Sequence, residues 1–444
     1  FRTIARSTTQ IAAFSAAQIG QLSETSFSAL NGTQVGALSA AQIRGVTTTQ
    51  IAGLQAADIE EFTTTQITSL TATQVSAFTT TNINALSTTQ LGAFSASQIG
   101  ALNATNLAAL DANQMAALTA TQIRGLTTTQ LVNLSSTDLG ELTSTQIGAL
   151  TRTQTVALTA TQISALDATQ SAGLTTTQIQ GLTTAQLRGL DETDIGDLTT
   201  TQLSSLAAAQ VGQLTATSFS ALSETQLGAL STAQLAGVTT TQLAALTTTD
   251  VAEFTTTQIT ALNATQLANI SATNIAALTT TQVGALTATQ IGLLKTTQFS
   301  ALDATQVAAI SATQLRGVTA AQIAALDATD ISELSATQVG LLSRTQFNAL
   351  NATQLSALDA DQAAGITTTQ ITGLSQAQIR GLNETDVAEL STTQLAAFSG
   401  TQIGQLTATA FVALDETQVG ALSVTQLKGL TTTQLSALST TDLN

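Results

Sequence analysis

Residues 174–189 read LTTTQIQGLTTAQLRG, and this stretch decides the fold because it states one eight-residue pattern twice. Cutting the chain into octads from Arg6 gives 55 lines without an insertion or deletion, and the last line is one residue short. The consensus octad is Leu, then Thr/Ser/Asp/Asn, any residue, Thr, Gln, Ile/Leu/Val, any residue, and Ala/Gly. A strict period of this kind predicts that each octad is one structural unit stacked on others.

Octad positions 2 and 5 carry the signals that start a helix. Position 2 is Thr, Ser, Asp or Asn in 52 of 55 octads, with Gln55, Ala207 and Lys295 as exceptions, and position 5 is Gln in 42 of 55. Thr-x-x-Gln is a capping box, and the Leu at position 1 with the Ile or Leu at position 6 forms a hydrophobic staple. Each octad is therefore expected to start a helix that the next cap ends after about one and a half turns.

The predicted fold is all-α: a solenoid of very short capped helices, one per eight-residue repeat. A β-solenoid is the alternative, because runs of Thr favour strands. The frequent Ala, Leu and Gln favour helix, and a period of eight would put Leu and Ile on opposite faces of a strand.

A longer period runs through the octads. The sequence SFSAL at Ser26–Leu30 returns at Ser218–Leu222, and AFVAL at Ala410–Leu414 is a third copy; each step is 192 residues, or 24 octads. This spacing indicates duplication of long blocks.

We accordingly expect one continuous octad-repeat solenoid over residues 1–444. Its superunits would span about 14–205 and 206–397, with a partial copy at 398–444 and an out-of-phase lead-in at 1–5. The chain starts at Phe1 and stops inside an octad, so we interpret it as part of something longer.

Asp replaces the position-5 Gln in seven octads, which follow one another at steps of ten, seven, seven, ten, seven and seven octads. If 24 octads close in seven turns, one turn holds about 3.4 octads or about 27 residues, and the Asp octads lie on one side of the solenoid. Half that pitch, about 14 residues per turn, fits the integers equally well, but solenoid repeats usually hold about 20–45 residues. The seven residues are Asp58, Asp138, Asp194, Asp250, Asp330, Asp386 and Asp442.

These octads raise the question of a metal site, since they place carboxylates three residues apart on one helical face. Hard oxygen ligands suit Ca²⁺, although no segment matches an EF-hand or a calcium β-roll. The interpretation that we favour needs no cofactor: acids near a helix N-terminus are stabilised by the helix dipole, and the others are solvated. The candidate Ca²⁺ ligands are Asp58, Glu61, Asp138, Glu141, Asp194, Asp197, Asp250, Glu253, Asp330, Glu333, Asp386 and Glu389.

The composition excludes several classes of function. The chain has no Cys and no His, so it cannot form a zinc site of the usual ligands, a disulfide or a Ser-His-Asp or Cys-His centre. Its net charge of −16 disfavours nucleic acid and anionic membranes as partners. No apolar run approaches a transmembrane helix. We expect neither enzymatic activity nor a small-molecule substrate.

Three other sets of residues permit a second interpretation. Asn31, Asn103, Asn263, Asn351 and Asn383 begin Asn-x-Thr triplets, which accept N-glycans, but all five stand at the capping position. The Thr-rich face presents a regular lattice of hydroxyls that could bind ice or a glycan, or simply be the capping layer. A set of basic residues precedes Gly and is expected to bind helix C-terminal carbonyls or a neighbouring chain's acids: Arg44, Arg124, Arg188, Arg316, Arg380 and Lys428.

Octads such as LTATQIRG and LSTTQLGA resemble repeat tracts of very large bacterial secreted or cell-surface proteins, which are described as adhesin-like or biofilm-associated. The resemblance covers essentially the whole chain and implies an extracellular structural role. We therefore expect a stiff extracellular rod or filament that self-associates, with a binding module for ice or glycans as the alternative.

Overall fold

The computed structural model describes residues 7–438. These residues form 54 α-helices, and every one of them begins at octad position 3, so that helix αn begins at residue 8n, from α1 (Thr8–Ala12) to α54 (Thr432–Ala437). Residues 7–438 contain no strand, which excludes the β-solenoid and confirms the all-α prediction. The lead-in at 1–5 and Asp442 lie outside the described residues.

The helices hold four to six residues each, and five is the commonest length. The helices of six residues are α8, α11, α12, α15, α16, α18, α19, α21, α23, α24, α25, α30, α32, α33, α35, α36, α40, α42, α45, α47 and α54. The helices of four residues are α22, α26, α29, α37, α39, α43, α44, α46, α50 and α53.

Each helix starts at a capping residue in extended conformation and ends close to the first residue of the next octad. In α15 (Ala120–Gly125), Thr119 has φ −73° and ψ 156°, and its hydroxyl accepts a hydrogen bond from the backbone of Gln122. The N–H of Leu126 donates to the carbonyl of Ile123, which closes the last turn. Leu126 itself is extended, so the chain leaves the helix there and enters the next cap.

The internal packing divides the chain into two compact units, Phe1–Leu230 and Ser231–Asn444. Within each unit the helices wind around a common core, and each helix packs against the helix three places further along the chain, as α12 (Ala96–Ala101) does against α15 and α42 (Ala336–Leu341) against α45 (Ala360–Gly365). The octad phase runs through both units without a break.

The pitch follows from the contacts between turns. Helices three octads apart pack together, and side-chain hydrogen bonds join residues 28 and 31 apart in the chain. The predicted turn of about 3.4 octads, or about 27 residues, is longer than the three octads between packed helices and shorter than the 28 and 31 residues between hydrogen-bonded residues. The alternative pitch of about 14 residues is therefore wrong.

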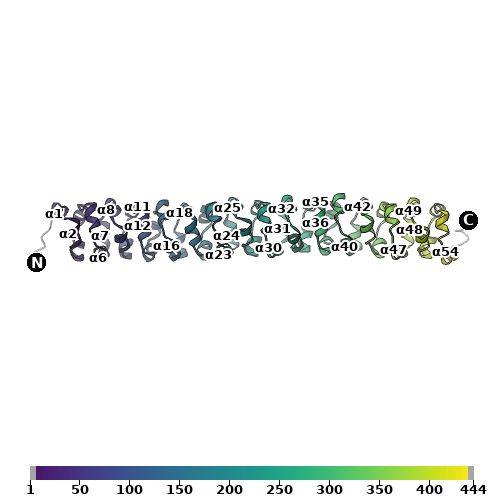
Figure 1. The fold of residues 1–444 in the computed structure, drawn as a ribbon, viewed down its shortest axis with the longest axis horizontal. Coiled ribbons are helices and arrows are strands. Elements are labelled where there is room, and N and C mark those ends of the chain that lie inside the picture. Colours follow the sequence, from purple (N-terminus) through teal and green to yellow (C-terminus); the bar gives the residue numbers. More distant parts are fainter. Residues whose placement is uncertain (1–6, 439–444) are drawn as a thin grey trace. The chain divides into compact units, whose positions relative to one another are not determined.

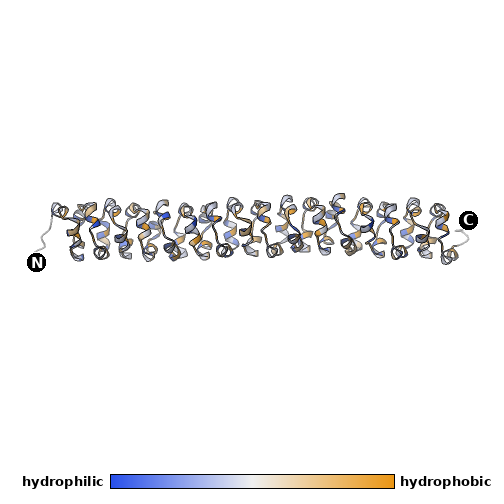
Figure 2. Cartoon of the chain, in the orientation of Figure 1, coloured by the Kyte–Doolittle hydropathy of each residue, from blue (hydrophilic) through white to orange (hydrophobic). Residues whose placement is uncertain are grey.

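The core of each unit consists of octad positions 1 and 6. At position 6, Ile123 and Ile323 are 0–1% exposed, and at position 1, Leu126 and Leu326 are 4–7% exposed. Figure 2 shows these apolar residues recurring along each unit between polar helix surfaces. A helix of about five residues is unstable alone, so its stability comes from this burial between turns.

Glycines stand where successive turns come closest. The backbone of Gly125 lies against Ala96 of the preceding turn, and a Cβ on Gly125 would overlap the carbonyl of Ala96. A Cβ on Gly100 would lie 2.5 Å from the carbonyl oxygen of Gly125. Gly92, in contrast, has no atom within 4 Å of such a Cβ.

Replacing Gly125 by alanine is expected to push these two turns apart and to lower the free energy of unfolding by about 1–3 kcal/mol. Gly92→Ala is the matched control, because it adds the same methyl group to a helix of the same unit in open space; it should be neutral or stabilising by up to about 1 kcal/mol. Urea denaturation followed by circular dichroism measures both changes, and equal effects would contradict the assigned contact.

Candidate functional site

The position-5 glutamines join each turn to the previous one. Gln122 of α15 accepts the backbone N–H of Thr119 on its Oε1 atom, at 2.8 Å. Its Nε2 atom donates to the carbonyls of Leu91 and Phe94, both at 2.8 Å, which belong to the preceding turn. We call these side chains, from Gln42 to Gln434, the glutamine ladder.

The ladder has the same geometry in the second unit. The Nε2 atom of Gln314 donates to the carbonyls of Val283 and Leu286 at 2.8 and 2.7 Å, and the side chain is 4% exposed. Gln122 and Gln314 thus each satisfy the N-terminus of their own helix and two carbonyls at the C-terminal end of another helix. Since the last carbonyls of a helix have no partner within it, one glutamine side chain forms hydrogen bonds with backbone groups at the start of one helix and at the end of another.

Smaller amides and hydroxyls at position 5 keep part of this function. Asn82 donates to the carbonyl of Leu54 at 2.8 Å, and Ser218 donates to that of Leu190 at 2.8 Å. For these two side chains, the bond to the carbonyl 28 residues earlier is the one retained.

The predicted caps are confirmed, including those at the Asn-x-Thr triplets. Asn31, Asn103, Asn263, Asn351 and Asn383 are all exposed, and the side chain of each accepts the backbone N–H of position 5. Glycosylation of these residues stays a prediction.

Two octads that lack a capping side chain still keep half of the box. The backbone N–H groups of Ala207 and Lys295 donate to Oε1 of Gln210 and Gln298 at 2.9 and 2.7 Å. The glutamine side chain therefore holds these helix starts without a partner at position 2.

Aspartate at position 5 keeps the cap but cannot donate to the carbonyls of the previous turn. Asp58 accepts the backbone N–H of Gln55 at 2.8 Å, but a carboxylate has no N–H to donate. In three octads it instead accepts a serine hydroxyl from 30 residues earlier, at 2.5–2.6 Å: Ser28 to Asp58, Ser164 to Asp194, and Ser300 to Asp330.

Every complete octad with Asp at position 5 also has an acidic residue at position 8. Position 8 is Glu61, Glu141, Asp197, Glu253, Glu333 or Glu389 in these octads and is never acidic in any other octad. The Oε2 atoms of Glu61, Glu141 and Glu333 are buried and accept no hydrogen bond from the described residues. The stacking of turns thus shields one oxygen of each carboxylate from water, while the side chains as a whole stay partly exposed.

Desolvation raises the pKa of these glutamates. It is the largest cause at Glu61, Glu141, Glu333 and Glu389, and the adjacent position-5 aspartate raises the pKa further. At Glu61 a hydrogen bond from the backbone of Gly32 opposes the rise in pKa.

The acids continue into the neighbouring turn. Asp111, Asp303 and Asp359 cap helices 27 residues before Asp138, Asp330 and Asp386, and the charge of each raises the pKa of Glu141, Glu333 or Glu389. The pKa of Asp303 itself is lowered, mainly by the Thr305 hydroxyl at 2.6 Å. We call the acids at positions 5 and 8 of the Asp octads, with these three caps, the acidic column.

Four arginines donate hydrogen bonds to backbone carbonyls, and two of them, Arg44 and Arg124, are among the basic residues predicted to bind helix C-termini. Nε of Arg44 donates to the carbonyl of Ser69 at 3.4 Å, and Nε of Arg124 to that of Ala149 at 3.3 Å; both carbonyls end helices of the next turn. Arg152 and Arg344, at position 3, donate through Nη2 to the carbonyls of Gln180 and Thr372. The prediction is confirmed for Arg44 and Arg124.

The described residues contain no group of three or more His, Cys, Asp or Glu arranged to hold a metal ion. The Ca²⁺ ligation that the sequence raised stays a prediction. In residues 7–438 no helix has the length and hydropathy needed to cross a membrane.

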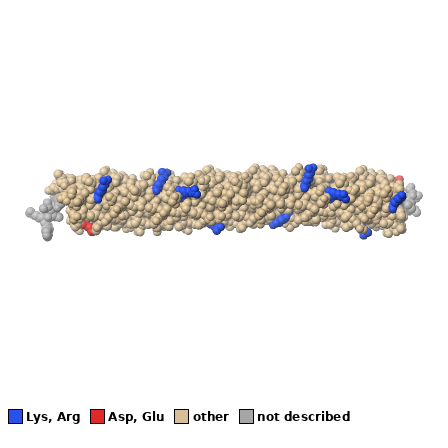
Figure 3. All heavy atoms as spheres, viewed as in Figure 1, with Lys and Arg blue, Asp and Glu red and all other residues tan. Residues whose placement is uncertain are grey.

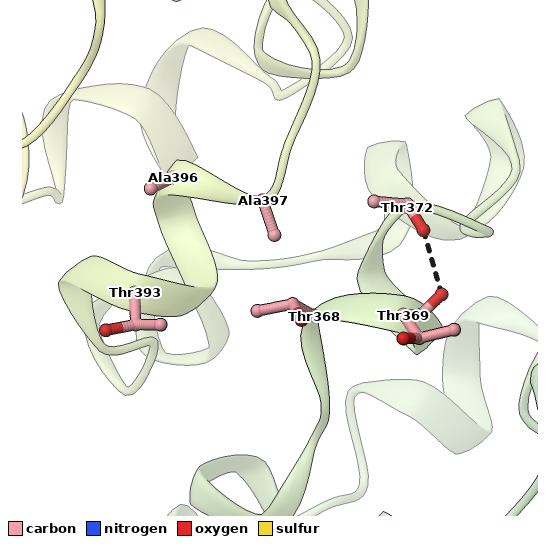
Figure 4. Close-up of a pocket in the computed structure, with 6 residues that line it drawn as sticks. All are labelled: Thr368, Thr369, Thr372, Thr393, Ala396 and Ala397. Atoms are coloured by element: carbon pink, nitrogen blue, oxygen red, sulfur yellow. Dashed lines mark hydrogen bonds between the residues drawn. The ribbon is translucent and has the colours of Figure 1, made fainter.

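A shallow open depression lies between α46 (Thr368–Ile371) and α49 (Thr392–Ala396). Figure 4 shows Thr368, Thr369, Thr372 and Thr393 around it with two alanines, and the hydroxyl of Thr372 donates to the carbonyl of Thr369 at 2.9 Å. Its lining offers hydroxyl and methyl groups and carries no charged side chain. Binding of ice or glycans to such a surface stays a prediction.

The glutamine ladder is tested by removing its donor while keeping its shape. Gln122→Glu retains the cap acceptor but places a carboxylate beside two carbonyls, so we expect a loss of about 2–4 kcal/mol in unfolding free energy at pH 7. Gln18→Glu is the control, because Gln18 is exposed and makes only the cap bond; it should change stability by less than about 0.5 kcal/mol. Equal losses in denaturant titrations would contradict the inter-turn role.

The acidic column should make stability depend on pH. Because the pKa of Glu61 is raised in the folded chain, its protonation favours folding: this stabilisation is complete below the unfolded pKa and disappears as pH rises through the folded pKa. Glu61→Gln should therefore raise the melting temperature at pH 7 and have little effect at pH 4. Glu60→Gln, at the exposed neighbouring residue, should do neither, and a pH-independent effect of Glu61→Gln would contradict the assignment.

Three stretches of the chain match the family model described as the ALTTAQ repeat, at residues 51–88, 115–152 and 219–256. No curated protein matches the chain. The chain is thus similar to ALTTAQ repeat tracts over these three segments, and it is a repetitive, all-α, solenoid-like protein.

Proposed function

We propose that this protein is a structural element: a stiff extracellular rod or filament, such as a surface, matrix or adhesin stalk, with no catalytic activity. The observation that carries the proposal is the match between the first and last turns of the described residues, 7–438. Each presents groups that are buried in the internal turns.

The first turn presents donors of the glutamine ladder. Gln10 and Gln18 are exposed, whereas Gln42, Gln50 and the ladder members that follow in α8 and α9 are buried. Gln10 and Gln18 make the cap bond to Ser7 and Ser15 through Oε1, and an amide in this position has N–H groups that can reach a further turn.

The last described turn presents the opposite surface. Leu427 and Leu435, at position 6, are 43% and 52% exposed, while Leu395 at the same octad position is 0% exposed. Their carbonyls occupy the ladder position that Leu395 fills, where Gln426 donates at 2.8 Å. A further turn placed on this surface would bury two leucines and supply the missing amides.

These surfaces favour end-to-end continuation of the solenoid, either by more octads or by a second copy of the chain. Burial of apolar side chains contributes about 25 cal/mol per Å², and open ends of a solenoid promote assembly unless polar capping repeats cover them. The extracellular location is supported by the resemblance of the octads to tracts of bacterial surface proteins. The net charge of −16 argues against nucleic acid as a partner.

End-to-end association is tested by making the terminal leucines polar. Leu427→Asn with Leu435→Asn should shorten the particles seen by negative-stain electron microscopy to single chains and reduce the sedimentation coefficient. Val132→Asn with Val156→Asn is the control, because these two side chains are 44% and 38% exposed but lie on internal helices; it should leave particle length unchanged. Wild-type chains that stay single at high concentration would refute the proposal.

A further inference from the structure

The charges of each unit are segregated around its surface. Figure 3 shows a face on which Lys and Arg recur while almost all Asp and Glu lie outside the view, and this holds in each unit taken by itself. The acids are the more numerous, with 27 Asp and Glu against 11 Lys and Arg in the whole chain. Their scarcity on this face therefore means that the acidic residues are concentrated on other faces of each unit.

The spacing in the sequence explains the segregation. Arg44 lies one and three-quarter octads before Asp58, and Arg124 and Arg152 lie at that same distance before and after Asp138. In the second unit, Arg316 and Arg344 flank Asp330 in the same way.

This spacing amounts to half a turn. Acids in adjacent turns of the column are 27 residues apart, and a turn holds about 3.4 octads, so one and three-quarter octads carry the chain to the opposite side of the solenoid. The five arginines therefore lie across the solenoid from the acidic column, and we call them the basic face.

Part of each arginine is anchored to its own unit. Arg44 and Arg124 use Nε to bind the carbonyls of Ser69 and Ala149, and Arg152 and Arg344 use one Nη2 atom. All four side chains are exposed. Because a guanidinium carries five N–H donors, donors remain on a side chain that the solenoid already holds in place, which lowers the entropy lost when it binds a carboxylate.

The acidic column is held with similar firmness. Asp58 and Asp330 are fixed by the cap N–H and by a serine hydroxyl, and Glu61 and Glu333 each bury one carboxylate oxygen between turns. A cation approaching this side meets carboxylates in two successive turns. Desolvation raises the pKa of Glu333 most, and the repulsion between these carboxylates raises it further. Positive charge supplied from outside would relieve that repulsion.

We infer that a second copy of this chain binds laterally, with its basic face against the acidic column and the two chains parallel. This inference deepens the proposed structural function and rests on it. Within the first unit, a parallel copy shifted sideways sets Arg44 beside Asp58 and Glu61, and Arg124 beside Asp138 and Glu141. The second unit taken by itself offers the same match of Arg316 with Asp330 and Glu333.

The spacing favours parallel over antiparallel copies. Within the first unit, Arg44 and Arg124 are ten octads apart, as are Asp58 and Asp138, so a parallel neighbour matches both pairs at once. An antiparallel neighbour can also match both pairs, with Arg124 against Asp58 and Arg44 against Asp138. Arg152 distinguishes the two arrangements: a parallel neighbour brings it to residue 166, beside Asp167, whereas this antiparallel neighbour brings it to residue 30, in an octad without an acid.

The contact joins two different faces of the chain, so it is heterologous and leaves an acidic column and a basic face free on the outer sides of a pair. Such contacts do not close, and they extend into ribbons or sheets. Since the whole chain carries a net charge of −16, non-matching arrangements are repelled, and the matched charges determine the register.

Charge reversal on the basic face tests this inference. Arg124→Glu with Arg316→Glu should raise the protein concentration needed for lateral association at least ten-fold. The matched control is Arg188→Glu with Arg380→Glu: these arginines also stand at octad position 7 before a Gly and share the 24-octad step, but lie within one octad of Asp194 and Asp386, off the basic face. The control should associate like the wild type, and circular dichroism verifies that both variants fold.

Electron microscopy separates this inference from end-to-end assembly, because particle width reports lateral contact and particle length reports end contact. Wild-type particles should be wider than one solenoid at about 50 mM NaCl and of single width at about 1 M NaCl, where the Debye length falls to about 3 Å. Single-width wild-type particles at every salt concentration, or face and control variants that behave alike, would overturn the inference whatever the particle length.

Orientation is tested in the same assemblies with a single label. The chain contains no Cys, so Thr49→Cys on the exposed surface of α6 (Thr48–Ala52) accepts one dye. Mixing donor- and acceptor-labelled chains should give efficient energy transfer within wide particles, because parallel neighbours bring like positions together. Wide particles without transfer would exclude the parallel arrangement.

Discussion

A chain made of helices of four to six residues leaves most of its helical backbone groups without partners inside the helix, and that is the constraint on which this structure depends. Each buried polar group left unpaired costs about 1–3 kcal/mol, which is large beside the net stability of a folded domain of about 5–15 kcal/mol. The glutamine side chain meets this constraint because one amide has an acceptor and two donors. Its Oε1 serves the start of its own helix, and its Nε2 serves carbonyls one turn away.

The remaining features of the fold follow from this amide. Its reach fixes the distance between turns, so Leu and Ile of successive turns meet in the core and side chains that enlarge the gap are excluded at the closest points. Gly125 stands at one of those points. Where Asp replaces Gln, the inter-turn donor is absent, and serine hydroxyls together with a second carboxylate occupy the gap. The acidic column is thus a local departure from the ladder and also the most strongly charged surface of each unit.

The all-α class, the helix starts and the approximate pitch could be predicted from sequence because they depend on local signals, the Thr-x-x-Gln box and the strict period. The second function of Gln could not be derived from the box alone, since it joins residues 28 and 31 apart. One signal was nevertheless present: a capping box accepts Glu as readily as Gln, yet no octad has Glu at position 5. The strong preference for Gln over Glu indicates a use for the N–H₂ group in most octads, although Asp replaces Gln in seven. The burial of one carboxylate oxygen of Glu61 and of Glu333 was not predictable, because it depends on how closely neighbouring turns approach.

The spacing of the acidic column has a consequence for how such a protein changes length. A duplication or deletion of one superunit adds or removes 24 octads, the sum of the ten-, seven- and seven-octad steps between the Asp octads. These 24 octads correspond to a whole number of turns, so every acid keeps its place around the axis. Adding one octad would instead rotate everything beyond it by roughly a third of a turn, so the acids beyond the insertion would no longer line up with those before it. Recombination between distant superunits therefore changes the length of the molecule without disturbing its sides, whereas slippage by single octads would scramble them.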